Sequence, residues 1–193
     1  MNNPYLDEIN ELKEKAKSTQ PVGFRSHYAA GMEIWQHRRE LAKKYAWAIP
    51  DETAIHLIAE LEPIVEIGAG TGYWAWLLRQ CGVHIKPYDR KPGKNHWVEG
   101  LWTGVIAGGP RNAKRYPDHA LMLCWPLYDD RMAFECLSRY TGDTVVYIGE
   151  GSGGCTGDDK FHAMLYERFA EVKQHDIPKW WGLHDSLEIW RRK

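Results

Sequence analysis

Residues 63–78 constrain the fold of this chain more than any other stretch. The short apolar run 64–67 is rich in β-branched residues, which is typical of a buried strand. The glycine-rich turn 68–72 follows at once, and the apolar residues of 74–78 recur at helical spacing. The sequence therefore predicts a strand, a tight turn and a helix, which together form the opening unit of a nucleotide-binding α/β fold.

An acidic residue at the end of the next predicted strand adds to this unit. Asp89 stands 21 residues after Gly68. Glycines let a ligand approach the backbone closely, and the first N–H groups of a helix then face that ligand. The two features together predict a pocket for an adenosine-bearing cofactor. The third glycine comes one residue too early for the dinucleotide fingerprint, and Tyr73 stands where that fingerprint has glycine, which argues against NAD and FAD.

The rest of the chain extends this unit on both sides. Helices are predicted over 5–17 and 32–48, and a third helix begins at Asp51, a good N-cap. Only a short connection separates Asp89 from the third strand, which leaves little room for a crossover helix. The predicted strands cover 64–67, 83–88, 103–107, 121–125, 144–148, 171–177 and 187–191, and the last two close as a hairpin.

Composition excludes several classes of protein. The 193 residues suit one domain, with 44% hydrophobic and 26% charged residues. The net charge of −1 does not favour tight electrostatic binding of nucleic acid. The four cysteines form no CxxC pair, and no apolar run approaches the ~20 residues that span a bilayer. We therefore expect a cytoplasmic protein with reduced thiols and no membrane partner, and the oligomeric state stays open.

The segment 65–72, Val-Glu-Ile-Gly-Ala-Gly-Thr-Gly, resembles the first motif of class I S-adenosylmethionine-dependent methyltransferases. The resemblance covers roughly residues 60–190. It implies a Rossmann-like α/β fold, with a seven-stranded, mostly parallel sheet whose final strand is antiparallel. It also implies that residues 61–193 form the S-adenosylmethionine-binding domain, while residues 1–60 form a helical cap.

The same resemblance assigns cofactor contacts. Asp89 takes both ribose hydroxyls, because a carboxylate accepts from two adjacent O–H donors at once. Glu66 helps to fix the amino group of the methionyl part, which the glycine turn holds. The predicted cofactor-binding residues around the turn are Glu66, Gly68, Ala69, Gly70, Thr71, Gly72 and Asp89. Arg25 and Tyr28 precede the fold and are candidates for the methionine carboxylate.

The turn after the fourth strand is the predicted acceptor side. Residues 125–128, Trp-Pro-Leu-Tyr, partly resemble the turn of amine-directed members of the family, but lack its polar first residue and its second proline. Trp125 could face the methyl sulfonium, since a cation over an indole face is favourable by ~0.5–2 kcal/mol. Pro126 and Tyr128 complete the predicted catalytic turn, and Cys124 before it is assigned to the cofactor site or to packing under the next helix.

A long glycine-rich loop, 149–159, follows the fifth strand on the side where α/β sheets bind ligands. Glu150 and His162 are candidate general bases or substrate anchors. Asp158 and Asp159 are expected to cap the next helix. No metal is predicted, because these acids and His162 show none of the usual metal-binding spacings.

The sequence therefore predicts an S-adenosylmethionine-dependent methyltransferase that acts on a nitrogen or oxygen of an unidentified acceptor. One alternative is a non-catalytic cofactor-binding or partner subunit on the same fold, which the altered turn at 124–127 favours. A third hypothesis is a nucleic-acid methyltransferase, which the net charge disfavours.

Overall fold

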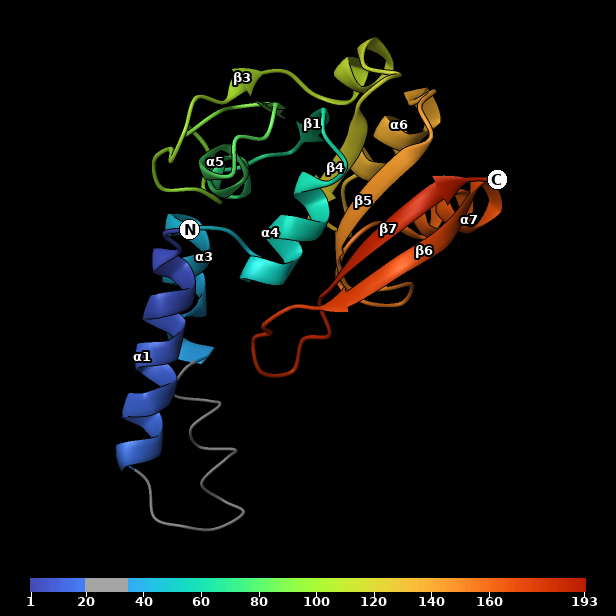
Figure 1. Cartoon of the computed structure of the whole chain (residues 1–193). Coiled ribbons are helices and arrows are strands. Elements are labelled where there is room, and N and C mark those ends of the chain that lie inside the picture. The colour runs from blue at the N-terminus through green and yellow to red at the C-terminus, as the bar shows by residue number, and fades with distance from the viewer. Residues whose placement is uncertain (20–34) are drawn as a thin grey trace.

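The computed structural model describes residues 1–19 and 35–193, and seven strands form a single sheet in the order β3-β2-β1-β4-β5-β7-β6 (Figure 1). The strands from β1 to β5 run parallel, and β7 runs antiparallel to both of its neighbours. This order confirms the Rossmann-like sheet with an antiparallel final strand. The strands are β1 Ile64–Ile67, β2 Ile85–Asp89, β3 Ile106–Ala107, β4 Ala120–Cys124, β5 Thr144–Gly149, β6 Phe169–Asp176 and β7 Ser186–Arg192.

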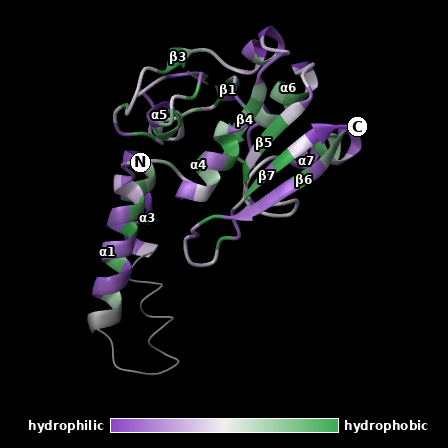
Figure 2. Ribbon diagram, in the orientation of Figure 1, coloured by the Kyte–Doolittle hydropathy of each residue, from purple (hydrophilic) through white to green (hydrophobic). Residues whose placement is uncertain are grey.

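Helices pack on both faces of this sheet. Successive residues of a strand point to opposite faces of the sheet. The apolar strands β4 and β5, green in Figure 2, therefore contribute side chains to two separate hydrophobic cores, one on each face. One core unites β1, β4 and β5 with α1, α3, α4 and α5, and the other unites them with α6 and α7. The helices are α1 Pro4–Thr19, α3 Arg38–Lys44, α4 Glu52–Ala59, α5 Tyr73–Gln80, α6 Met132–Arg139 and α7 Asp159–Arg168, with a 3-10 helix η1 at Pro110–Arg115.

Two helices begin at aspartates, as the sequence predicts. The Asp51 side chain accepts a hydrogen bond from the N–H of Ala54 at 2.8 Å, and Asp158 accepts one from Phe161 at 2.8 Å. Each bond satisfies a backbone donor that the first turn of a helix leaves free, and such a cap stabilises a protein by about 1 kcal/mol.

The helices before β1 share the core of the sheet. Tyr5 and Ile9 of α1 are buried in the same cluster as Ile64 of β1. A domain boundary at residue 60 stays a prediction. Within the predicted helix 32–48, the described helical residues are 35–36 and α3, which ends at Lys44. Residues 45–48 are not helical, so the prediction is too long at this end. Within residues 1–19 and 35–193, no helix has the length and apolar character needed to span a membrane.

The connection between β2 and β3 contains no α-helix, as its length predicts. It folds back over the end of α3 instead. The N–H of Glu99 donates to the carbonyl of Lys43 at 2.8 Å, and the indole N–H of Trp102 donates to the carbonyl of Lys44 at 2.6 Å. The backbone N–H of Trp102 also donates to Thr71, which lies in the glycine turn, at 2.9 Å. This connection therefore places residues 90–102 beside the glycine turn and α3.

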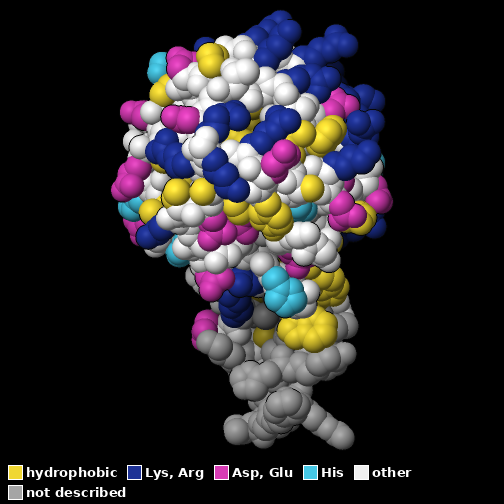
Figure 3. Space-filling view, turned by 90° about the vertical axis from the view of Figure 1, so that its right-hand side faces the viewer, with side chains coloured by type: hydrophobic (Ala, Val, Ile, Leu, Met, Phe, Trp, Pro, Cys, Tyr) yellow, Lys and Arg dark blue, Asp and Glu magenta, His cyan; other side chains and the backbone are white. Residues whose placement is uncertain are grey.

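Strand β6 lies at one edge of the sheet and is mostly polar (Figure 2). The molecular face on this side carries Lys and Arg side chains with Asp and Glu side chains among them (Figure 3).

Candidate functional site

The glycine turn adopts backbone conformations that side chains disfavour. Gly68 and Gly70 have φ angles of 84° and 57° and line a cavity. A Cβ atom on Gly68 would lie 2.8 Å from the Cε atom of Met132, the end of a flexible side chain, so the positive φ is the stronger reason for glycine here. Gly72 differs, because a Cβ atom there would lie 2.7 Å from Val105, in the β2–β3 connection. Gly72 therefore allows close packing, whereas Gly68 and Gly70 face the cavity.

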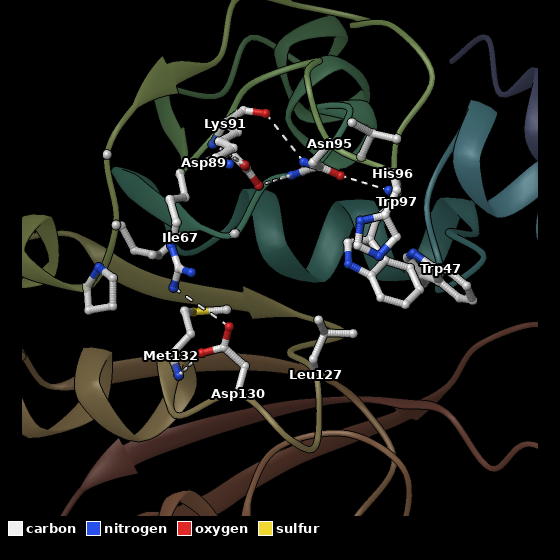
Figure 4. A pocket seen from close by; sticks show the side chains of 17 residues that line it. Trp47, Ile67, Asp89, Lys91, Asn95, His96, Trp97, Leu127, Asp130 and Met132 are labelled. Atoms are coloured by element: carbon white, nitrogen blue, oxygen red, sulfur yellow. Dashed lines mark hydrogen bonds and ion pairs between the residues drawn. The ribbon is translucent and has the colours of Figure 1, made fainter.

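Asp89 lies at the end of β2 and also lines this cavity (Figure 4). One carboxylate oxygen accepts from the N–H of Gly70 at 3.0 Å, and the other accepts from Lys91 at 2.9 Å. A carboxylate offers about four lone-pair positions, so about two remain for a ligand. The Gly70–Asp89 bond fixes the turn and the acid relative to each other. Glu66 is not among the residues that line this cavity.

The cavity has a volume of about 340 Å³, which lies in the range of small-molecule sites. Arg90 and Asp130 approach each other to 3.7 Å across it, but both are exposed, so this pair contributes little stability. Its lining comes from the glycine turn, the ends of β1 and β2, the connections after β2, β3 and β4, and the start of α6: Trp47, Ile67, Gly68, Gly70, Asp89, Arg90, Lys91, Asn95, His96, Trp97, Val98, Gly108, Gly109, Pro110, Leu127, Asp130 and Met132.

Glu66 is buried in β1, two residues before the turn, and its Oε2 atom has no hydrogen-bond partner within the described residues. Burial and, to a smaller extent, the charge of Asp89 raise the pKa of this carboxyl to about 8, although the charge of Arg79 opposes them. A buried carboxyl without a partner costs free energy that an incoming cation would offset. Glu66 is therefore suited to pair with a positively charged group of a ligand.

The remaining residues of the turn serve the local fold. The N–H of Ala69 donates to the carbonyl of Tyr88 at 2.9 Å, which ties the turn to β2. The hydroxyl of Thr71 donates to the carbonyl of Tyr45 and accepts from the N–H of Tyr73 at 3.2 Å. These bonds connect the turn to α3 and to the start of α5.

Trp125 directly follows β4, in a left-handed conformation with φ of 51°. Its backbone N–H donates to Ile148 at 2.7 Å, and its indole N–H donates to the Asp185 carboxylate at 2.9 Å. Its ring stacks on Trp47, with the centroids 5.1 Å apart. The structure therefore places Trp47 in the cavity wall and Trp125 behind it.

The other residues of this turn have separate environments. The carbonyl of Pro126 accepts from Gly157 at 2.9 Å, so the turn is tied to the loop after β5. Tyr128 is 45% exposed and does not line the cavity. Burial raises the pKa of Cys124 well above its usual value, which keeps the thiol protonated.

Glu150 and His162 are occupied by contacts within the fold. The Glu150 carboxylate accepts from the N–H groups of Cys155 and His184, both at 2.8 Å. His162 is buried on α7, and its Nε2 atom lies 2.9 Å from the carbonyl of Thr156. Neither residue lines the cavity, and both hold the loop after β5 in place.

Two of the predicted residues, Arg25 and Tyr28, lie outside the described residues. In the parts of the chain that the structure describes, no group of three or more His, Cys, Asp and Glu side chains could hold a metal ion. Sequence reasoning missed Trp47, Arg38 and Asp185, because no motif marks them and their positions depend on the folding of distant segments.

The similarity of this chain to known proteins lies in its fold. Neither a protein-family model nor a curated protein sequence matches the chain. The N-methyltransferase NodS from Bradyrhizobium japonicum, solved with S-adenosyl-L-homocysteine, is 14% identical, with a TM-score of 0.48 over 72% of this chain and 84% of its own. Magnesium protoporphyrin IX methyltransferase from Synechocystis, also solved with that compound, is 9% identical, with a TM-score of 0.47 over 95% of this chain and 94% of its own.

An rRNA methylase from Streptococcus thermophilus is 14% identical, with a TM-score of 0.43 over 72% of this chain and 94% of its own. The described acceptors of these proteins differ, so the similarity does not indicate an acceptor. The solved structures that this chain resembles are S-adenosylmethionine-dependent methyltransferases, the family whose first motif the glycine turn resembles.

Proposed function

We propose that this chain binds S-adenosylmethionine in the cavity and transfers its methyl group to a nitrogen or oxygen nucleophile. One observation carries the proposal: the Gly70 N–H bonds to the Asp89 carboxylate, so the glycine turn and the acid form two sides of one cavity. Glu66 stands two residues before that turn, and its buried Oε2 atom has no hydrogen-bond partner among the described residues.

Each of these residues offers a distinct contact to the cofactor. Gly68 and Gly70 leave room for the methionyl part beside the backbone. Asp89 accepts from the ribose hydroxyls with the lone pairs that Gly70 and Lys91 leave unused. Glu66 ionises and pairs with the ammonium group, which removes the cost of a buried carboxyl without a partner.

When bound, S-adenosylmethionine supplies a methyl group on a positively charged sulfur. The indole rings of Trp47 and Trp97 line the cavity, and a cation over such a ring is favourable by ~0.5–2 kcal/mol. Because the methyl donor is intrinsically reactive, the main contribution of the chain is to hold donor and acceptor in line. The net charge of −1 favours an acceptor other than nucleic acid.

Calorimetry with S-adenosylmethionine and S-adenosylhomocysteine tests the binding step. We expect Asp89→Ala to weaken binding by about tenfold or more, the value of one or two hydrogen bonds to a charged group. Glu167→Ala is the control, because this exposed side chain on α7 also carries one negative charge but lies outside the cavity lining. The proposal fails if neither compound binds at millimolar concentration, or if Asp89→Ala binds as well as the unmodified protein.

Transfer is tested separately, with S-adenosylmethionine carrying a labelled methyl group and extracts of metabolites, proteins and nucleic acids. Label in any product supports an enzyme. Cofactor binding without label in any product would instead support a non-catalytic binding subunit.

A further inference from the structure

Two indole rings and one imidazole ring lie together at one end of the cavity (Figure 4), and we call their residues the aromatic corner: Trp47, His96 and Trp97. The indole rings of Trp47 and Trp97 have centroids 5.7 Å apart and planes 69° apart, and the His96 ring lies 4.2 Å from that of Trp97. Trp97 is 38% exposed, so part of its surface is open to a ligand. The corner is therefore an accessible, mainly apolar part of the cavity wall.

Contacts within the fold hold the rings of the corner in place. Trp125 stacks on Trp47 with the centroids 5.1 Å apart, and the guanidinium carbon of Arg38 lies 4.9 Å from the Trp47 centroid. The Asn95 side chain accepts from the backbone N–H of Trp97 at 2.9 Å, which fixes the backbone that carries this ring. Rings that are held in advance lose little conformational freedom when a ligand binds, which favours binding.

The aromatic corner adjoins the glycine turn. A Cβ atom built on Gly70 would lie 3.4 Å from the Cγ1 atom of Val98, the residue after Trp97. In the proposed function the methionyl part lies against this turn and the ribose lies against Asp89, so the sulfur that joins them lies between the two. The acceptor must approach the methyl group in line with the bond to this sulfur. An acceptor that approaches from the corner would lie against the two indole rings.

The charged residues of the cavity lining do not belong to the corner: they are Asp89, Arg90, Lys91 and Asp130. Two backbone N–H groups bind Asp89, and Arg90 lies 3.7 Å from Asp130. The corner itself therefore offers no carboxylate to a cationic acceptor, and no Lys or Arg to an anionic one. It offers ring contacts for recognition instead of an ion pair.

The angle between the two indole rings suits one flat ring. Aromatic pairs prefer offset-stacked or edge-to-face arrangements, because the face of each ring is negative and its edge is positive. A ring that stacks on Trp97 is inclined to Trp47 by the same 69°, which is close to an edge-to-face arrangement. A flat aromatic ring thus obtains both favourable arrangements at once, whereas a saturated ring of the same size obtains neither.

We propose that the aromatic corner recognises the methyl acceptor, and that this acceptor carries its nucleophilic nitrogen or oxygen on a flat aromatic ring. The ring stacks on Trp97 and meets Trp47 edge to face, which directs its nucleophile towards the methyl group. Trp97 is then a specificity-determining residue. This inference rests on the proposed function for the role of the ring as acceptor, whereas the preference for a flat ring is measured without methyl transfer.

The test compares 2-naphthol with decahydro-2-naphthol, which has the same carbon skeleton and hydroxyl group but no aromatic ring. The protein is saturated with S-adenosylhomocysteine, and dissociation constants are measured through the indole N–H signals in two-dimensional NMR. The Trp97 signal is assigned by its absence from the spectrum of Trp97→Phe. We expect 2-naphthol to bind about tenfold more tightly than the saturated compound, the contribution of two aromatic pairs, and to shift the Trp97 signal.

Three variants separate recognition of the ring from a structural role. Trp97→Leu removes the aromatic face but keeps an apolar side chain, so the preference for 2-naphthol should fall to about twofold or less. Trp97→Phe keeps an aromatic face and should keep most of the preference. Trp181→Leu is the control, because Trp181 is 47% exposed and lies outside the cavity lining, and it should leave the preference unchanged.

The outcomes distinguish this inference from the proposed function. If S-adenosylhomocysteine binds but the two compounds bind equally, or neither binds at millimolar concentration, or Trp97→Leu retains the preference, the inference is overturned. If 2-naphthol binds only to the free protein and S-adenosylhomocysteine displaces it, the corner holds the cofactor itself, which also overturns the inference. If S-adenosylhomocysteine does not bind, the proposed function fails. A preference of the free protein for 2-naphthol that Trp97→Leu abolishes would then still support a site for a flat ring in the corner.

Discussion

At the scale of single residues, Asp185 gives a stability prediction that needs no ligand. Burial raises its pKa from 3.8 to about 6, so the folded state holds its proton more tightly than the unfolded chain does. The stability that this proton provides is full below pH 3.8 and is lost as the pH rises to about 6. The total change is of order 3 kcal/mol, at about 1.4 kcal/mol per pKa unit.

We therefore expect the stability of Asp185→Asn, relative to the unmodified protein, to increase between about pH 4 and pH 6 and to stay constant above. Urea unfolding at several pH values measures this difference. Asp176→Asn should show no such increase, since its exposed carboxylate has a lowered pKa through Lys179. A relative stability of Asp185→Asn that does not change with pH would contradict the expectation.

Glu66 gives a prediction about the protons released when the cofactor binds. Burial raises its pKa to about 8, so the free protein is mostly protonated there at pH 7. A ligand ammonium group that pairs with Glu66 requires the ionised form, so binding should release close to one proton at pH 7. Calorimetry in phosphate and in Tris measures this release, because the two buffers have different ionisation enthalpies. Glu66→Gln should bind without proton release, and equal heats in both buffers for the unmodified protein would exclude the pairing.

The sequence predicts residues whose role is local, and misses those whose role depends on distant contacts. Gly68, Gly70 and Asp89 stand in a strand–turn–helix unit with fixed spacing, so their positions around one cavity follow from a motif. Asp185 is held by Trp125, 60 residues away in the sequence, and no short pattern encodes that contact. The role predicted for Glu150 stays a prediction, and no short pattern indicates that its carboxylate accepts from two backbone N–H groups in the structure.

At the scale of elements, the cap of α7 can be tested directly. The Asp158 side chain accepts from the N–H of Phe161 at 2.8 Å, whereas Asp159 lies within the first turn. Asp158→Ala should lower the free energy of unfolding by about 1 kcal/mol. Asp159→Ala, the matched control, loses only an interaction with the helix dipole, worth about 0.3–1 kcal/mol. Urea unfolding of both variants gives the comparison, and a larger loss in Asp159→Ala would refute the assignment of the cap.

A separate prediction concerns the reactivity of Cys155, which lies in the loop after β5. Partial burial, the hydrogen bond to Glu150 and the charge of Glu150 together raise the pKa of this thiol to about 12. Glu150→Gln removes the charge, so we expect a lower pKa and faster alkylation of Cys155 by iodoacetamide, by about threefold per pKa unit, since the nucleophilicity of a thiolate falls with its pKa. Cys81 is also exposed and serves as the internal control in the same mass spectra. Equal Cys155 rates in both proteins would show that Glu150 does not control the thiol.

Helices and strands with a clear hydrophobic period are predicted better than those whose bounds depend on contacts with other segments. Strand β1 matches its predicted bounds, and α5 contains the residues 74–78 whose helical spacing predicts it. The third strand is predicted over 103–107 but covers only Ile106–Ala107, because the preceding connection bonds to α3 and the glycine turn instead. The fourth strand ends before Trp125, whose left-handed φ breaks the extended backbone.

At the scale of the whole molecule, the alternation of apolar β-branched runs with helical patterns predicts an α/β fold, and the resemblance to the methyltransferase family implies the arrangement of the strands in the sheet. How the N-terminal helices join the sheet is not predictable from their amphipathic pattern, which shows a buried face but not what covers it. In the structure, Ile9 of α1 and Met122 of β4 belong to one core. We therefore expect α1 to unfold together with the sheet.

Ile9→Ala tests that conclusion with a reporter on the other side of the sheet. Cys136 of α6 is buried in the second core, so its thiol reacts only after that core opens. Removing most of a buried Ile side chain costs about 2–5 kcal/mol. If the molecule unfolds as one cooperative unit, the urea midpoints of circular dichroism and of Cys136 alkylation should fall together. Val172→Ala, at a 56% exposed position of β6, should change neither midpoint appreciably. A Cys136 midpoint that stays unchanged in Ile9→Ala would instead support an independent N-terminal unit with a boundary near residue 60.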